Sequence, residues 1–249
     1  MKNNKLKMIS LNIEYDRHLP NVLKFLKKEN ADVVCLQEVL EKDFLTIKEA
    51  LGMRGYFVPW SYSKSTKYPY LRGEKQGLAI FSNTITNHGH VFFAGQEKNV
   101  SDRSFEEYLS DENWQKNWVF LWVQVSFGKQ SLRIITTQLP TTKEGVPTQY
   151  QLETIQSLMI RLDPFGEFIL CGDTNAPRGR EAFGRLARRY KDNIPVKYKT
   201  SIDQNLHHVK GIQLMVDGLF TTPDYRASNV RLVDGVSDHM AVVAKIAKN

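Results

Sequence analysis

The chain has 249 residues, 41% hydrophobic and 24% charged, which is typical of a globular protein with a full core. It contains no apolar run of about 18 residues, so no membrane span is expected, and its basic start lacks the apolar region of a secretory signal. The net charge of +7 is consistent with binding of nucleic acid or phosphorylated molecules, and equally with a generally basic surface. Cys35 and Cys171 lie inside apolar runs, which favours buried thiols and a cytoplasmic location.

The first half of the chain alternates short apolar runs with amphipathic segments. Apolar runs predict strands, and apolar residues at helical spacing predict helices. A polar, basic and aromatic loop spans 61–76. In chain order we expect a strand at 6–13, a helix at 19–31, a buried strand at 32–39, a helix at 42–52, strands at 56–61 and 77–83, and a helix at 104–115.

The second half begins with two apolar runs joined by a turn at 127–130, which predicts a hairpin over 118–140. Many strands with interspersed helices predict a mixed α/β fold. No repeat or linker divides the sequence, so we expect one domain over 1–249. The remaining elements expected are helices at 148–162 and 179–190 and strands at 168–173, 214–222, 229–235 and 239–246.

Polar residues occur at the ends of several of these apolar runs. Each alone has an ordinary explanation, such as a turn or a helix cap. Together they would bury several carboxylates near one another, which is costly without a cation. A set rich in oxygen and poor in histidine is typical of Mg²⁺ or Mn²⁺ sites. The residues are Asn12, Glu38, Asp173, Asn175, Asp217, Asp238 and His239.

The motifs that carry these residues resemble those of the endonuclease/exonuclease/phosphatase superfamily over residues 6–246. They are "SLN", "LQEV", "GLAIFS", "TTQLP", "GDTNAP", "VDGLF" and "SDHMAV", in that order. The resemblance implies a four-layer α/β sandwich, two mixed β-sheets flanked by helices, with the site where the strand ends converge. The superfamily includes deoxyribonucleases, AP endonucleases and tyrosyl-DNA phosphodiesterases, and "LQEV" and "GDTN" are especially like the last group.

The resemblance also implies how a metal ion would be held. Glu38 would be the principal ligand of Mg²⁺ or Mn²⁺, and Asp238 a second ligand or a neighbour of one. Asn12 would help to hold the metal or the phosphate of the substrate. Glu14 stands two residues after Asn12, where the family often has Asp, and could assist.

The remaining residues have roles at the phosphate. By the same resemblance, Asp173 would orient or deprotonate the attacking water, and Asn175 would fix the phosphate. His239 would bind the phosphoryl oxygen as an imidazolium, with its tautomer held by Asp217. Asp173 and Asn175 stand two apart on an extended segment, so their side chains can face one site together.

Gln138 departs from the family pattern, because many relatives have histidine at this strand end. Glutamine can donate a hydrogen bond to the phosphate but carries no charge. The change is consistent with a slower natural enzyme, with a different substrate, or with a variant from which the histidine was removed.

We expect Arg178 to bind substrate, because it closely follows Asn175. The sequence thus predicts a metal-dependent phosphodiester hydrolase, a nuclease or a DNA-end-processing phosphodiesterase, that works as a monomer on nucleic acid without a membrane. Two alternatives stay open. One is a phosphatase or phospholipase-type hydrolase of small phosphorylated molecules, and the other is a weakened or non-catalytic member, suggested by Gln138.

Overall fold

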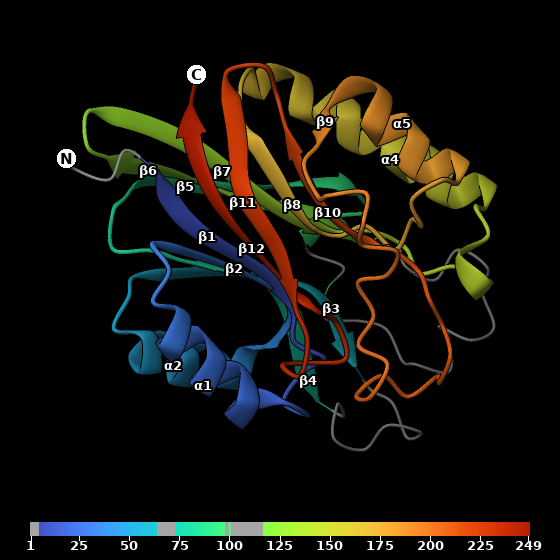
Figure 1. The fold of residues 1–249 in the computed structure, drawn as a ribbon, viewed down its shortest axis with the longest axis horizontal. Helices are drawn as coiled ribbons and strands as arrows, with labels where there is room; N and C mark the ends of the chain where they lie inside the picture. The colour runs from blue at the N-terminus through green and yellow to red at the C-terminus, as the bar shows by residue number, and fades with distance from the viewer. Residues whose placement is uncertain (1–4, 64–72, 98–99, 101–116) are drawn as a thin grey trace.

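The computed structural model describes residues 5–63, 73–97, 100 and 117–249. Two six-stranded mixed sheets lie against each other in the centre of the molecule (Figure 1). Helices α1 (Leu19–Glu29) and α2 (Glu41–Leu51) cover the outer face of one sheet, and α4 (Gln149–Leu162) and α5 (Glu181–Arg189) cover the other. The four-layer sandwich expected from the sequence is therefore confirmed.

The first sheet has the strand order β11-β12-β1-β2-β4-β3, and the second has the order β5-β6-β7-β8-β10-β9. The strands of the first sheet are β1 (Leu6–Asn12), β2 (Val33–Leu40), β3 (Gly55–Ser63), β4 (Glu74–Phe81), β11 (Tyr225–Val233) and β12 (Ala241–Lys248). Those of the second are β5 (Ile85–Ala94), β6 (Trp118–Phe127), β7 (Gln130–Gln138), β8 (Ile169–Asp173), β9 (Lys191–Asp192) and β10 (Asp217–Thr221).

Several helix ends coincide with signals in the sequence. Pro20 lies in the first turn of α1, where its missing N–H costs no hydrogen bond. Gly52 ends α2 in a left-handed conformation. Thr148 caps α4 by accepting a hydrogen bond from the N–H of Gln151. None of the helices among the described residues is long and apolar enough to cross a membrane.

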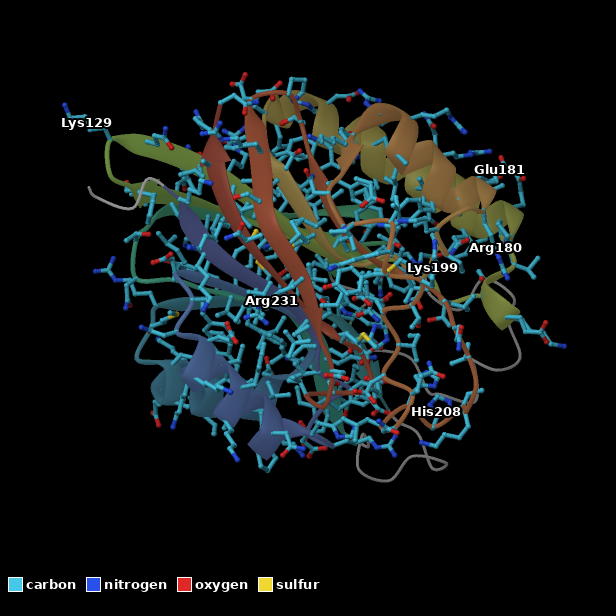
Figure 2. The ribbon with its side chains drawn as sticks, viewed as in Figure 1. Lys129, Arg180, Glu181, Lys199, His208 and Arg231 are labelled. Carbon is cyan, nitrogen blue, oxygen red and sulfur yellow. The ribbon has the colours of Figure 1, made fainter. Side chains whose placement is uncertain are left out.

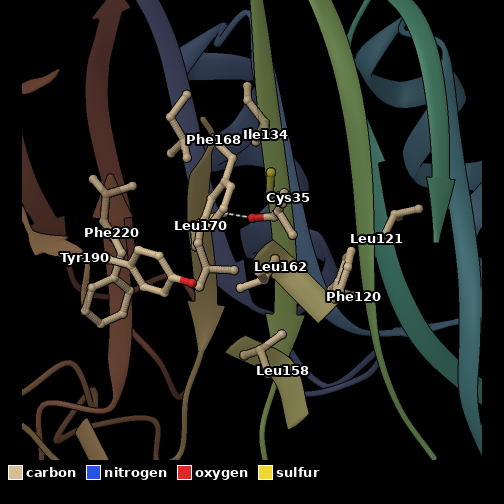
Figure 3. Packing of buried hydrophobic residues seen from close by; sticks show 14 of the residues in the cluster. Cys35, Phe120, Leu121, Ile134, Leu158, Leu162, Phe168, Leu170, Tyr190 and Phe220 are labelled. Atoms are coloured by element: carbon tan, nitrogen blue, oxygen red, sulfur yellow. Dashed lines mark hydrogen bonds between the residues drawn. The ribbon is translucent and has the colours of Figure 1, made fainter. Parts of the chain in front are cut away.

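The core has one layer between the two sheets, where Cys35 of β2 meets Cys171 of β8. A second layer lies between the second sheet and its helices, where Phe220 packs against Phe183 of α5. Figure 3 labels Cys35, Phe120, Leu170 and Phe220, which belong to one cluster of buried residues. All four side chains are buried, and burying one large apolar side chain contributes about 1.5–3 kcal/mol. Cys171 is also buried and carries a free thiol, as the apolar runs predicted. This shared core fixes the position of one sheet against the other.

Strands β5 and β10 differ from what the sequence predicted. The edge strand β5 was not predicted, because its polar sequence "ITNHGH" has no apolar run. The strand expected at 214–222 begins only at Asp217, because the carbonyls of 214–216 accept hydrogen bonds from the loop N–H groups of 174, 178 and 201. The predicted helix at 104–115 and most of the predicted loop at 61–76 lie outside the described residues.

Candidate active site

The ends of strands from both sheets bring the predicted residues together. Strands β1 and β2 run parallel and pair Asn12 with Gln37, next to Glu38. In the other sheet β7 and β8 run parallel and pair Gln138 with Asp173. Because β10 runs antiparallel to β8, the first residue of β10, Asp217, lies opposite the last residue of β8.

Glu38 is aimed by an irregularity in its strand. The register between β2 and β4 shifts between Leu36 and Val39, and Glu38 has a φ of 58°, a left-handed conformation that Glu seldom adopts. Such a bulge re-aims a side chain at the end of a strand. Glu38 Oε1 accepts hydrogen bonds from Asn12 Nδ2 at 3.0 Å and from Gln138 Nε2 at 2.7 Å, so it is held from both sheets.

Among the described residues, no group donates a hydrogen bond to Glu38 Oε2, which leaves that oxygen for a ligand. Gln138 Oε1 is buried and has no hydrogen-bond partner. The amide N–H of Gln138 that the sequence assigns to the phosphate therefore contacts the Glu38 carboxylate in this structure. This makes Gln138 a residue that positions Glu38.

Asn12 lies between the two carboxylates. Its Nδ2 also donates to Asp173 Oδ2 at 3.1 Å, and its Oδ1 accepts the N–H of Glu14 at 3.1 Å. A metal would bind the amide oxygen, which here is occupied by the backbone. Glu14 itself turns toward Arg17 and His18, with Oε2 at 2.9 Å from His18 Nε2.

Asp173 and Asn175 form a tight turn after β8. Asp173 Oδ1 accepts the N–H of Asn175 at 2.9 Å, and Oδ2 accepts its side-chain amide at 3.2 Å. The same amide donates to the carbonyl of Leu139 at 2.9 Å. The turn depends on Gly172, because a Cβ there would lie 1.9 Å from the carbonyl oxygen of Thr137. The close approach of β7 and β8 thus requires glycine.

His239 lies two residues before β12, although the sequence predicted a strand from residue 239, and it faces two carboxylates. Its Nδ1 is 2.8 Å from Asp217 Oδ2, and its Nε2 is 3.9 Å from Asp173 Oδ2. Asp217 is held in turn by Ser201, whose hydroxyl oxygen accepts the N–H groups of Val216 and Asp217. Ser201 could not be predicted from the sequence, because an isolated Ser in a loop carries no signal of this role.

The electrostatics of the cluster indicate an excess of negative charge. Burial and the charge of Asp238 raise the pKa of Glu38 from 4.5 to about 7, against the hydrogen bonds from Asn12 and Gln138. Burial, with a contribution from Asp217, raises the pKa of Asp173 from 3.8 to about 6.

The histidine responds to the same charges with the opposite sign. Burial alone would lower the pKa of His239, but Asp217, Asp173 and Asp238 raise it well above 6.5. An imidazolium at this position balances only part of the carboxylate charge. A bound cation would balance the rest.

Two groups of side chains could hold such a cation. Ligand atoms of Asp173, Asp217 and His239 all lie within 4.8 Å of one another. Glu38 and Asp238 offer a second pair of carboxylates, near enough for the charge of Asp238 to raise the pKa of Glu38. The Ser237 hydroxyl donates to Asp238 Oδ1 at 3.1 Å. The second group offers only oxygen ligands, which Mg²⁺ and Mn²⁺ prefer.

Arg178 does not join this cluster. Its guanidinium Nη2 lies 2.6 Å from Asp192 Oδ2 and donates to the carbonyl of Ile194 at 2.9 Å. Asp192 pairs with Phe220, three residues along β10 from Asp217. The contacts of Arg178 are therefore structural in this state, and a role in substrate binding stays a prediction.

The comparison with family models decides the family. The model described as the endonuclease/exonuclease/phosphatase family matches residues 9–239, which include every residue of the cluster. The chain belongs to the endonuclease/exonuclease/phosphatase family. Members of this family are generally hydrolases of phosphoesters, and the family typically uses a divalent metal. None of the curated proteins compared with the chain matches it.

Solved structures of the family share the fold at low sequence identity. The human Nocturnin catalytic domain with bound sulfate has a TM-score of 0.73 and 16% identity, covering 99% of this chain and 94% of that one. D. rerio TDP2, humanised by 14 mutations, has a TM-score of 0.66 and 15% identity, covering 99% and 100%. A Bacteroides thetaiotaomicron mannosyl-6-phosphatase has a TM-score of 0.71 and 13% identity, covering 97% of this chain and 99% of that one. These identities support the shared fold alone.

Proposed function

We propose that the chain is a Mg²⁺- or Mn²⁺-dependent phosphodiester hydrolase, acting as a nuclease or a DNA-end-processing phosphodiesterase. One observation carries the proposal. The carboxylates of Glu38 and Asp238 lie beside a hydrogen-bonded Asp217–His239 pair and Asp173, at the converging strand ends of a family fold. Such a site offers a place for a cation, a base and a positive charge together.

Glu38 and Asp238 would hold the cation. A bound divalent ion neutralises the charge of the phosphate and polarises its oxygen. Gln138 and Asn12 would keep the Glu38 carboxylate in place, since both donate to Oε1. Asn12 would also contact the phosphate if its amide left the carboxylates when substrate entered.

Asp173 would act on the attacking water. Its pKa of about 6 leaves it ionised at neutral pH, and Asn175 fixes its orientation through two hydrogen bonds. As the water oxygen bonds to phosphorus and the bond to the leaving oxygen breaks, the proton from the water would pass to Asp173. The leaving oxygen would take a proton from solvent.

His239 would bind the charged oxygen of the phosphoryl group through Nε2, because Asp217 occupies Nδ1 at 2.8 Å. That bond fixes the ring and keeps the imidazolium form. A preorganised charged donor of this kind contributes roughly 2–4 kcal/mol to a transition state.

The proposed substrate is nucleic acid, supported by the net charge of +7. The alternative is a phosphatase of small molecules, because one structural neighbour is described as a mannosyl-6-phosphatase. Both reactions could use the same cluster, so only substrates separate them.

The test is a panel assay with Mg²⁺ or Mn²⁺. The panel contains single-stranded and duplex DNA, RNA, an AP-site duplex, a phosphotyrosyl-DNA oligonucleotide and a hexose 6-phosphate. The proposal expects metal-dependent cleavage of at least one nucleic acid, lost in Asp173→Asn and unchanged in Arg189→Ala, a control on α5. Hydrolysis of the sugar phosphate alone would favour the alternative, and no turnover would favour a non-catalytic member.

A further inference from the structure

A loop over residues 203–210 lies against the segment that carries Asp238 and His239. The N–H of Asp203 donates to the carbonyl of Asp238 at 2.8 Å, and Ile202 forms an isolated β-bridge with His239. The N–H of Met240 donates to the carbonyl of Ser201 at 2.7 Å. Hydrogen bonds made by residues 201–203 thus fasten the start of the loop to the candidate site on both sides of His239.

The loop is built in one conformation by its own polar groups. Asp203 is buried, and its Oδ1 accepts the N–H groups of Asn205 and Leu206 at 2.8 and 3.0 Å. Its Oδ2 accepts the N–H of Gly235 at 2.6 Å. Lys210 Nζ donates to the carbonyl of Asn205 at 2.6 Å. A loop fixed in this way can present a side chain at low entropic cost.

Two histidines stack at the tip of this loop. The ring centroids of His207 and His208 are 4.5 Å apart and their planes are inclined by 26°. His207 is half-buried, and its Nδ1 lies 3.0 Å from both the N–H and the carbonyl of Val209. His208 is exposed, and Figure 2 shows it at the margin of the molecule. The ring of His208 is therefore exposed to solvent and stacks on the ring of His207.

The pair also lies within electrostatic range of the site. Burial lowers the pKa of His207, the charge of Asp238 opposes this effect, and His239 adds to it. Ile202 pairs with His239 and Asp203 bonds to Asp238, so the loop begins beside His239. A nucleotide next to a phosphate bound at His239 would therefore lie near this loop. No catalytic step uses either histidine of the pair.

We infer that His208, backed by His207, is a stacking surface for an unpaired nucleobase next to the scissile phosphate. The substrate would then be single-stranded nucleic acid or a frayed end, and a sugar phosphate would gain nothing from this surface. The inference rests on the proposed function for its substrate class. Stacking of a base on an aromatic side chain changes binding by roughly tenfold.

The experiment compares two oligomers with the same charge. Fluorescence anisotropy in Ca²⁺ buffer measures Kd for a labelled thymidine octamer and for an abasic octamer. We expect the unaltered protein to bind the thymidine oligomer roughly tenfold more tightly. His208→Ala should remove this preference, whereas His208→Tyr should keep it, because tyrosine can also stack. His90→Ala, at an exposed histidine of β5 beside Glu97, should change nothing.

A full base preference in His208→Ala, or no preference in the unaltered protein, would overturn the inference. Circular dichroism of each variant separates a lost surface from a lost fold, and His208→Tyr provides the second check. If single-stranded DNA is cleaved but His208 has no effect, only this inference fails. If His208 governs binding but no phosphodiester is cleaved, the proposed reaction fails and the surface remains.

Discussion

Replacing Glu38 with glutamine should stabilise the metal-free protein while removing metal binding. The carboxyl of Glu38 is raised in pKa from 4.5 to about 7 in the folded state. Between those values the folded protein binds more protons than the unfolded chain. The contribution of Glu38 to the free energy of unfolding therefore falls as pH rises through this window, and it is fully present below pH 4.5.

The size of the effect follows from the pKa change. A change from 4.5 to about 7, at about 1.4 kcal/mol for each pH unit, corresponds to about 3 kcal/mol. Glu38 is partly exposed, so solvent screening reduces this to about 2 kcal/mol. Glutamine keeps an oxygen that can accept from Asn12 and Gln138 but has no charge to desolvate.

The assay is urea unfolding of both forms in EDTA at about pH 5 and about pH 8. The variant should gain about 2 kcal/mol over the unaltered protein between the two pH values. Any constant effect of the amide cancels in this difference. Excess Mn²⁺ should stabilise only the unaltered protein, by about 2.7 kcal/mol at 100 times its Kd.

Glu29→Gln is the matched control, because its carboxyl has the opposite shift. Burial opposes the shift, but Lys7 and Arg231 lower the pKa of Glu29 below 4.5. The contribution of Glu29 to the free energy of unfolding is therefore present above pH 4.5 and lost below the lowered pKa. At about pH 8 the Glu29→Gln variant should be less stable than the unaltered protein. If Glu38→Gln shows the same pH dependence as the unaltered protein, the burial argument is wrong. Undiminished Mn²⁺ binding by the variant would refute the ligand assignment.

Three further predictions follow from single contacts. Gln138→Leu should weaken Mn²⁺ binding by about tenfold in calorimetry, because the 2.7 Å hydrogen bond to Glu38 is lost; an unchanged Kd would remove its positioning role. Asp217→Asn should lower the pKa of His239, so that in an NMR titration the ring loses its proton at lower pH; an unmoved titration would contradict the pairing. Gly172→Ala should cost more than about 4 kcal/mol or prevent folding, because its Cβ would meet Thr137 O at 1.9 Å. The control Gly128→Ala meets nothing within 4 Å and should cost only about 1 kcal/mol.

The sequence predicted most of the fold because buried strands need apolar runs. Strands such as β2 and β8 are buried along nearly their whole length, so their sequences are continuous in apolar residues. The edge strand β5 is half solvated, and its polar residues carry no such signal. β11 begins at Tyr225, four residues before the predicted start, because a bulge at Asn229 lets it pair further with β12.

The sequence also predicted which residues meet, but not which atoms. Strand-end positions place Asn12, Glu38 and Asp173 together, and hydrogen bonds between their side chains confirm that they do meet. The direction of an amide depends on the whole network, so spacing alone could not show that Gln138 donates to Glu38. Nor could it show that Arg178 pairs with Asp192, because that partner comes from a two-residue strand.

The unfavourable backbone conformation of Glu38 indicates that this residue has a functional role. Glu38 and Asn175 both have positive φ, at 58° and 47°. Asparagine tolerates this conformation, because its short side chain bonds to nearby backbone, whereas glutamate gains nothing from it. Glycine at position 38 would relieve the strain and remove a carboxylate whose pKa is raised to about 7 by burial. A residue that is unfavourable both in backbone conformation and in charge persists when a ligand compensates for it. At Glu38 a divalent cation would compensate for the charge, and the bulge is what turns the carboxylate toward it.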